Sequence, residues 1–163
     1  FFLGENDSIG ILEFMKAIQV ESVRIVAQKS SDEDIAKLGD YLNWMKTAEN
    51  YETYFSFDAG YHAYLAKLTE NNMFIKSIEI IENLLHVGLR DIAAIHGSEM
   101  SIQQHEDCFL ALQVRDTEKA VHIMVEHYDM LLGRLRKWLS LSEDERNSLD
   151  LENRIRIHAE KEQ

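Results

Sequence analysis

Four side chains of this chain combine metal-ligating chemistry with helical spacing. Asp58 and His62 are four residues apart, so they lie on one face of a helix. His105 and His127 each lie 11 residues from Asp116, where one predicted helix turns back into the next. Positions equidistant from such a turn lie side by side in antiparallel helices. Because buried polar groups need partners, we interpret the four residues as one layer of metal ligands.

The ligand types define the chemistry of this layer. Three imidazoles and one carboxylate suit a borderline divalent metal. We expect Zn²⁺, with Ni²⁺, Mn²⁺ and Fe²⁺ as the alternatives. If the metal takes five or six ligands, positions remain for water or for an oxygen atom of a small acid.

Each of these residues alone also fits a plainer role. A lone histidine on an apolar stripe is usually a core side chain bonded to a neighbour, and Asp58 could be such a neighbour. The shared depth and face of the four residues favour the metal interpretation. His122 lies off the stripe of His127 and is expected to face solvent, whereas Cys108 is expected to fill the core.

A nearly continuous helical periodicity positions the layer. The chain of 163 residues contains no proline and seven glycines, which favours helices over strands and long loops. Short connections favour antiparallel neighbours, so we expect an all-α antiparallel bundle of six or seven helices. The predicted helices cover 8–29, 32–49, 52–69, 73–95, 102–114, 117–139 and a last segment to about 160. The residues expected to face the core are Ile11, Phe14, Ile18, Ile25 and Val26 in the first helix and Ile35, Leu38, Leu42 and Met45 in the second.

Polar residues with a side-chain oxygen mark the expected helix starts. The expected N-caps are Asp7 or Ser8, Ser31, Asn71, and Asp116 or Thr117. Two further patterns predict capping boxes, in which a serine and an acidic or amide residue three positions later bond reciprocally. These pairs are Ser101 with Gln104 and Ser142 with Glu145.

The helix lengths place the four ligands at one depth. The turns predicted near Asn71 and Asp116 lie two helices apart, and therefore at the same end of an up-down bundle. At a rise of ~1.5 Å per residue, His62 lies ~13 Å and Asp58 ~20 Å from that end. His105 and His127 each lie ~16 Å from it. The four residues therefore occupy a slab about one helical turn thick.

Charge and composition exclude several functions. The net charge of −12 repels phosphate backbones, so this chain is not expected to bind nucleic acid by itself. Its best basic stretch, residues 134–137, is typical of the cationic last turn of a helix. No apolar run is long enough for a membrane span, and the N-terminus lacks the pattern of a signal peptide. A single cysteine suits a reducing compartment, so we expect a cytoplasmic location.

The residues around the layer resemble a known family. Residues 57–66 and 70–72 resemble the D-x-x-F-H…N signature of the FCD domain, and the first helix is similar as well. The similarity extends to the family's later histidine-bearing helices at 97–99, 104–106, 111–120 and 126–127. The FCD domain is the C-terminal effector-binding module of the FadR branch of GntR-family bacterial transcription regulators. The resemblance covers essentially the whole chain.

The resemblance implies that residues 1–163 form a single FCD-like ligand-binding and dimerisation domain. We do not expect this chain to include the winged-helix DNA-binding domain that normally precedes it. In metal-containing members an aspartate and three histidines hold a divalent ion under a small cavity; by position these are Asp58, His62, His105 and His127. The cavity typically receives a small organic acid, whose binding alters how the homodimer presents its winged helices to DNA.

Two positions depart from the family's pattern. The family usually carries an arginine where Met15 stands and a glutamate where Gln19 stands, and that arginine often holds the effector carboxylate. We therefore expect Arg90 to be the cation that reaches the effector, with Asn83 and His86 on the cavity wall. Met15 and Gln19 remain expected contacts by position.

These observations lead us to interpret the chain as a sensing domain rather than an enzyme. The alternative is a metal-dependent hydrolase on a helical bundle, which needs a general base beside a metal-bound water. Glu82 lies at a comparable depth, but nothing aligns it with the site. A di-iron bundle would need Glu-x-x-His pairs, which the layer lacks. A purely structural dimerisation module, with the histidines filling the core, is a further alternative.

Overall fold

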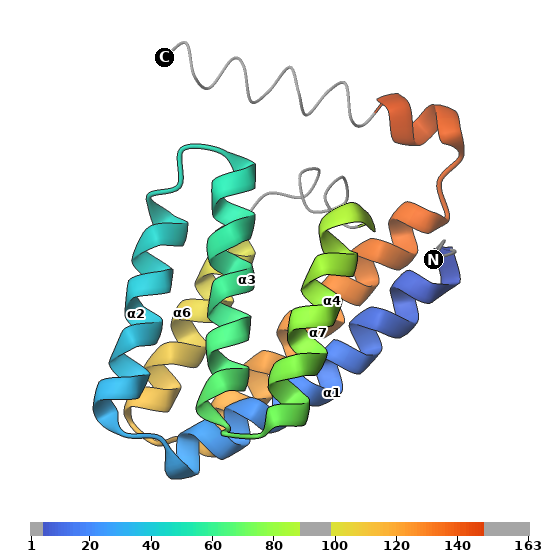
Figure 1. Cartoon of the computed structure of the whole chain (residues 1–163). Helices are drawn as coiled ribbons and strands as arrows, with labels where there is room; N and C mark the ends of the chain where they lie inside the picture. Colours follow the sequence, from blue (N-terminus) through green and yellow to red (C-terminus); the bar gives the residue numbers. More distant parts are fainter. Residues whose placement is uncertain (1–4, 89–98, 149–163) are drawn as a thin grey trace.

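The computed structural model describes residues 5–88 and 99–148, and their side chains over 7–81 and 99–148 (Figure 1). All regular structure in these two ranges is helical, which confirms the predicted all-α bundle. The predicted helical residues 89–95, and those beyond 148, lie outside the described residues. No helix in the described ranges is long and apolar enough to cross a membrane.

The helices begin and end close to the predicted positions. They are α1 (Glu5–Lys29), α2 (Asp32–Lys46), α3 (Tyr51–Leu68), α4 (Asn72–Gly88), α6 (Glu99–Gln113) and α7 (Thr117–Leu139). Residues 143–148 are also helical. Apart from α4, whose predicted end lies outside the described residues, no boundary differs from its prediction by more than three residues.

Three of the expected N-caps are confirmed. The side chains of Ser31, Asn71 and Asp116 each accept a hydrogen bond from a backbone N–H two or three residues on, at 2.9–3.1 Å. The capping box at Ser142 is also confirmed, because its backbone N–H donates to Glu145 Oε2 at 2.7 Å and its hydroxyl accepts from the backbone N–H of that glutamate at 3.4 Å. Local chemistry therefore sets these helix starts.

Two other cap predictions are wrong. Asp7 and Ser8 lie inside α1, which begins at Glu5, and Ser101 and Gln104 lie inside α6. A capping box spans the same three residues as a turn in the interior of a helix, so the pattern alone does not distinguish the two. In α6 these two residues bond to histidine side chains instead of capping the helix.

The buried face of α1 also differs from its prediction. Phe14 was expected to face the core, yet it is 50% exposed. Met15 and Gln19 are buried in its place. The buried face of α1 is therefore rotated relative to the predicted stripe. Gln19 fits on this face because its Nε2 donates to the carbonyl of His62, at 2.9 Å. This bond ties α1 to the helix that carries the first histidine.

The helices pack so that three histidine-bearing helices surround one region. α1 packs most extensively on α7, and α2 packs between α3 and α6. α6 also packs on α7, while α3 contacts α1 and α4. Figure 1 shows α2, α3 and α6 standing together, with α1 and α7 running obliquely beside them. Histidine rings from α3, α6 and α7 meet in the interior, with ring centroids 4.6–5.5 Å apart.

The turn between α6 and α7 sets the relative depth of two histidines. Arg115 adopts a left-handed conformation, with φ of 60°, and Asp116 N–H donates to the carbonyl of Ala111 at 2.9 Å. These features form a Schellman-type ending of α6. Arg115 also donates from Nη1 to the carbonyl of Ser30 at 2.7 Å and contacts the Asp32 carboxylate. The hairpin is thus anchored to the α1–α2 junction.

A continuous apolar core surrounds the interior polar groups. The predicted inward stripe of α2, comprising Ile35, Leu38, Leu42 and Met45, is entirely buried. Cys108 is also buried, as expected, and its thiol faces the carbonyl of Ala120 at 3.8 Å. Burial of each large side chain contributes roughly 1.5–3 kcal/mol. This packing surrounds the polar side chains of the interior.

Candidate metal centre

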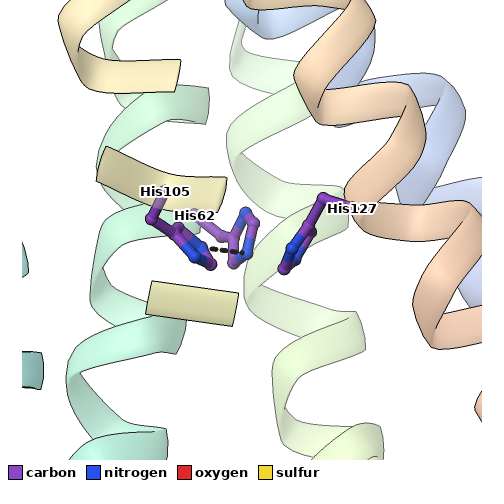
Figure 2. A group of neighbouring side chains, drawn as sticks. All are labelled: His62, His105 and His127. Atoms are coloured by element: carbon purple, nitrogen blue, oxygen red, sulfur yellow. Dashed lines mark hydrogen bonds between the residues drawn. The ribbon is translucent and has the colours of Figure 1, made fainter. Parts of the chain in front are cut away.

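Three imidazoles converge in the interior of the bundle. His62 comes from α3, His105 from α6 and His127 from α7, and each is at most 4% exposed. One ligand nitrogen from each ring lies within 4.8 Å of the other two. Figure 2 shows the rings turned toward one another, with His62 and His105 joined by a close contact. Three of the four predicted ligands are therefore brought together.

Asp58 lies at the edge of this group. Its Oδ1 is 3.4 Å from His105 Nε2, but it is not part of the compact group of three nitrogens. Its side chain is 19% exposed, and its Oδ1 accepts a hydrogen bond from the Tyr54 hydroxyl at 3.3 Å. The Asp58 carboxylate therefore faces the histidines from one side. Its second contact, the Tyr54 hydroxyl, lies one turn earlier on α3.

Hydrogen bonds on the outer nitrogens fix the orientation of two rings. His105 Nδ1 lies 2.6 Å from the carbonyl oxygen of Ser101, which can only accept, so Nδ1 carries the proton. His127 Nδ1 likewise donates to Gln104 Oε1 at 3.1 Å. In both rings Nε2 is then left with a free lone pair directed into the group. Such outer hydrogen bonds are typical of metal-ligating histidines.

The inner atoms fit a cation. His127 Nε2 is buried and has no hydrogen-bond partner among the described residues. His105 Nε2, an acceptor in this tautomer, lies 3.1 Å from His62 Nε2 and 3.4 Å from the Asp58 carboxylate. Two acceptors at such separations repel each other unless a proton or a cation lies between them. A divalent ion would satisfy all of these atoms at once.

The environment keeps two of the imidazoles neutral. Burial lowers the pKa of His62 to about 4; the Asp58 carboxylate opposes this shift and His105 adds to it. Burial also lowers the pKa of His127 well below its usual range, helped by His105, His62 and Arg134. Both rings are therefore uncharged at neutral pH. The neutral imidazole is the form that binds metal ions.

The residues expected to contact an effector are placed only in part. Met15 lies in the apolar core. Gln19 lies against the α3 backbone at His62, and its Oε1 is buried without a hydrogen-bond partner among the described residues. Asn83 and His86 belong to α4, but their side chains lie outside the described part. Arg90 also lies outside the described residues.

Three residues around the ligands, Tyr54, Gln104 and Arg134, were not predicted from the sequence. Tyr54 lies four residues before Asp58, so the helical period alone could have indicated it. Arg134 lies seven residues after His127, nearly on the same face of α7, and was interpreted as part of the cationic last turn of a helix. Gln104 carried no such signal, because only the packing of α6 against α7 brings its amide to the ring of His127.

Fold and site together define a helical bundle domain with a buried histidine group that could hold a metal ion. The family model of the FCD domain matches residues 10–130, and the chain belongs to this family. FCD domains are the effector-binding domains of GntR regulators, a regulatory and not a catalytic family. No curated protein sequence gives a significant match to the chain.

With Zn²⁺ as the probe of the candidate site, Gln104→Leu is expected to weaken metal binding by about ten- to hundredfold, because His127 loses the acceptor that fixes its tautomer. Competition with a chromophoric chelator measures this change. The neighbouring Gln103→Leu is the matched control, since Gln103 is exposed and bonds to Asp107 at 3.1 Å. Gln104→Glu, which keeps an acceptor, should retain most of the affinity. Equal zinc affinity in Gln104→Leu and wild type would show that this bond does not position His127.

Proposed function

We propose that this chain is the effector-sensing, metal-binding domain of a GntR/FadR-type transcription regulator. The observation that carries the proposal is the convergence of three buried imidazoles inside an FCD bundle. Two of these rings direct an Nε2 lone pair inward. His127 Nε2 is buried without a hydrogen-bond partner among the described residues. Burying such an acceptor is costly without a cation, so the arrangement supports a metal-dependent role.

The metal ligands we propose are His62, His105 and His127, with Asp58 as the fourth. This donor set suits Zn²⁺ best, and Ni²⁺, Mn²⁺ or Fe²⁺ are the alternatives. A bound ion would supply a Lewis acid that attracts a carboxylate or hydroxyl oxygen of the effector. The protein's part is to hold the imidazoles neutral, to orient them and to exclude competing water from three sides.

The proposed effector is a small organic acid bound beside the metal. Arg90, Asn83, His86, Met15 and Gln19 are proposed contacts for it. Residues 1–163 would act as one ligand-binding and dimerisation domain in a cytoplasmic homodimer. DNA binding would belong to a separate N-terminal winged-helix domain, and the effector would shift the dimer between two arrangements by its differential affinity for them.

The hydrolase alternative gains no support from the described residues. Hydrolysis requires a base placed to take a proton from metal-bound water. Asp58 is the one carboxylate beside the described group, and it is the proposed fourth ligand. Family membership also favours regulation over catalysis.

Zinc-loaded protein is expected to gain thermal stability from small hydroxy acids, and the gain should disappear when the metal is removed. The physical reason is that the acid binds through the ion, so the apo-protein offers it a much weaker site. Glycolate, malate and citrate are suitable probes in a thermal shift titration, before and after dialysis against EDTA. Equal stabilisation of both forms would show that the metal is not the anchor. Absence of any shift with metal bound would reject organic acids as the ligand class.

A further inference from the structure

The side chain of Arg134 lies beside the candidate metal centre, where it helps to lower the pKa of His127. It lies on α7 seven residues after His127, so the two side chains share nearly one face of the helix. Long side chains on helices point back toward the N-terminus of the helix, which here is the direction of His127. The Nη2 atom contacts the sulfur of Met100 at 4.0 Å, at the start of α6. The neighbouring Ser101 supplies the carbonyl that orients His105.

Arg134 has no carboxylate partner among the described residues, although the chain carries a net charge of −12. The other described arginines bond to carboxylates or to backbone carbonyls: Arg24 to Glu21, Arg115 to Ser30 and Asp32, Arg136 to Glu13, and Arg146 to the carbonyls of Trp138 and Leu139. Arg134 is half-buried. A partly desolvated guanidinium without a counterion is unfavourable, so it attracts an anion.

A second unsatisfied donor lies on α3, whose Tyr54 is close enough to Arg134 to oppose the lowering of the Arg134 pKa by burial. Tyr51, Tyr54 and Asp58 share one face of α3, and the two tyrosine rings are 5.9 Å apart. The Tyr54 hydroxyl already donates to Asp58. The Tyr51 hydroxyl is buried and has no hydrogen-bond partner among the described residues. Burial raises the pKa of the Tyr51 hydroxyl, so it stays protonated and available as a donor.

We propose that Arg134 and the Tyr51 hydroxyl form an anion subsite next to the three histidines, which takes a second carboxylate of the effector. The first carboxylate or hydroxyl of the same molecule would reach the metal. This inference rests on the proposed function and narrows the effector from small organic acids to dicarboxylates. Because the chain is strongly acidic, a dianion needs such a local positive charge to enter.

Comparing glycolate with malate on the zinc-loaded protein tests the subsite, because malate adds a second carboxylate to the same hydroxy-acid group. Wild type should bind malate at least about tenfold more tightly, as expected for a charge-assisted hydrogen bond. On protein fully loaded with zinc, Arg134→Gln should bring malate to within about twofold of glycolate, with glycolate binding unchanged. Tyr51→Phe, which removes only the hydroxyl, should reduce the preference severalfold. Arg136→Gln, which changes an exposed arginine paired with Glu13, is the control and should behave as wild type.

The outcomes separate the subsite from the proposed function. A full preference for malate in Arg134→Gln, or equal affinity for the two acids in wild type, would overturn the subsite and leave metal-dependent sensing intact. Failure of the zinc-loaded wild type to bind either acid would overturn both. If Arg134→Gln does not fold, Arg134→Lys keeps the charge without the planar fork. That variant should lose malate affinity severalfold and keep glycolate affinity, and equal losses for the two acids would reject the subsite.

Discussion

Saturation with Zn²⁺ is expected to raise the Tm of this protein by roughly 10 °C. A ligand present at a thousand times its Kd stabilises the folded state by about 4 kcal/mol, and for a domain of this size each 1 kcal/mol shifts Tm by about 2–4 °C. Elemental analysis should find about one ion per chain. His127→Ala should remove both the ion and the zinc-induced shift, because it deletes a buried ligand whose inward nitrogen has no other partner among the described residues.

The quantity to compare is the zinc-induced change in Tm, since replacing a buried imidazole also alters the apo-protein. His122→Ala is the matched control: it lies on the same helix, and its side chain is 70% exposed and 3.3 Å from Glu126. A full zinc shift in His127→Ala would exclude His127 from the site. Asp58→Asn distinguishes a three-ligand from a four-ligand site, because loss of a true ligand weakens zinc binding whereas loss of a neighbouring charge changes it little.

Acidification of the metal-free protein from pH 7 to pH 4 is expected to cost on the order of 3 kcal/mol of stability through His62 alone. The pKa of His62 falls from 6.5 to about 4 on folding because the ring is buried. Between these values the unfolded chain binds more protons than the folded chain, so stability falls as pH decreases. The destabilisation that His62 causes is small above about pH 6.5 and approaches its full size near pH 4. His127, whose pKa is also lowered by burial, acts in the same direction.

Urea unfolding at a series of pH values measures this dependence. Carboxylates also titrate in the window, so the informative quantity is the difference between wild type and His62→Gln, which removes the titrating ring. The variant should show a flatter profile between pH 6.5 and 4. Parallel profiles would mean that His62 does not stay neutral in the folded state. His122→Gln, in an exposed position, should leave the wild-type profile unchanged.

Much of the site could be predicted because it follows from helix geometry. The 3.6-residue period placed His62 and Asp58 on one face, and the equal distances of His105 and His127 from the α6–α7 turn placed them side by side. The structure brings the three histidines together as expected. Asp58 lies farther out than the depth calculation suggested, because that calculation gives position along the helix axis and not the reach or rotation of a side chain.

The wrong predictions share one physical cause. Ser101 and Gln104 matched a capping box, and Phe14 matched an apolar stripe, because local patterns contain no information about what lies across a helix interface. In the bundle, the carbonyl of Ser101 accepts from His105 and the Gln104 amide accepts from His127. Gln19 occupies the buried face of α1 because its amide bonds to the α3 backbone. The contacts of Gln104 and Gln19 depend on neighbours from other helices, whereas the contact between Ser101 and His105 lies within α6.

The amino-acid sequence by itself determined the helices, most of their caps, the antiparallel order and the layer of histidines, because these depend on periodicity and on contacts within a few residues. Only the tertiary structure decided which nitrogen of His105 and His127 carries the proton, and that Arg134 is the cation beside them. Those properties arise from atoms 2.6–4.0 Å apart on different helices or different turns. A shift of one side chain by its own width would change them while leaving every helix in place.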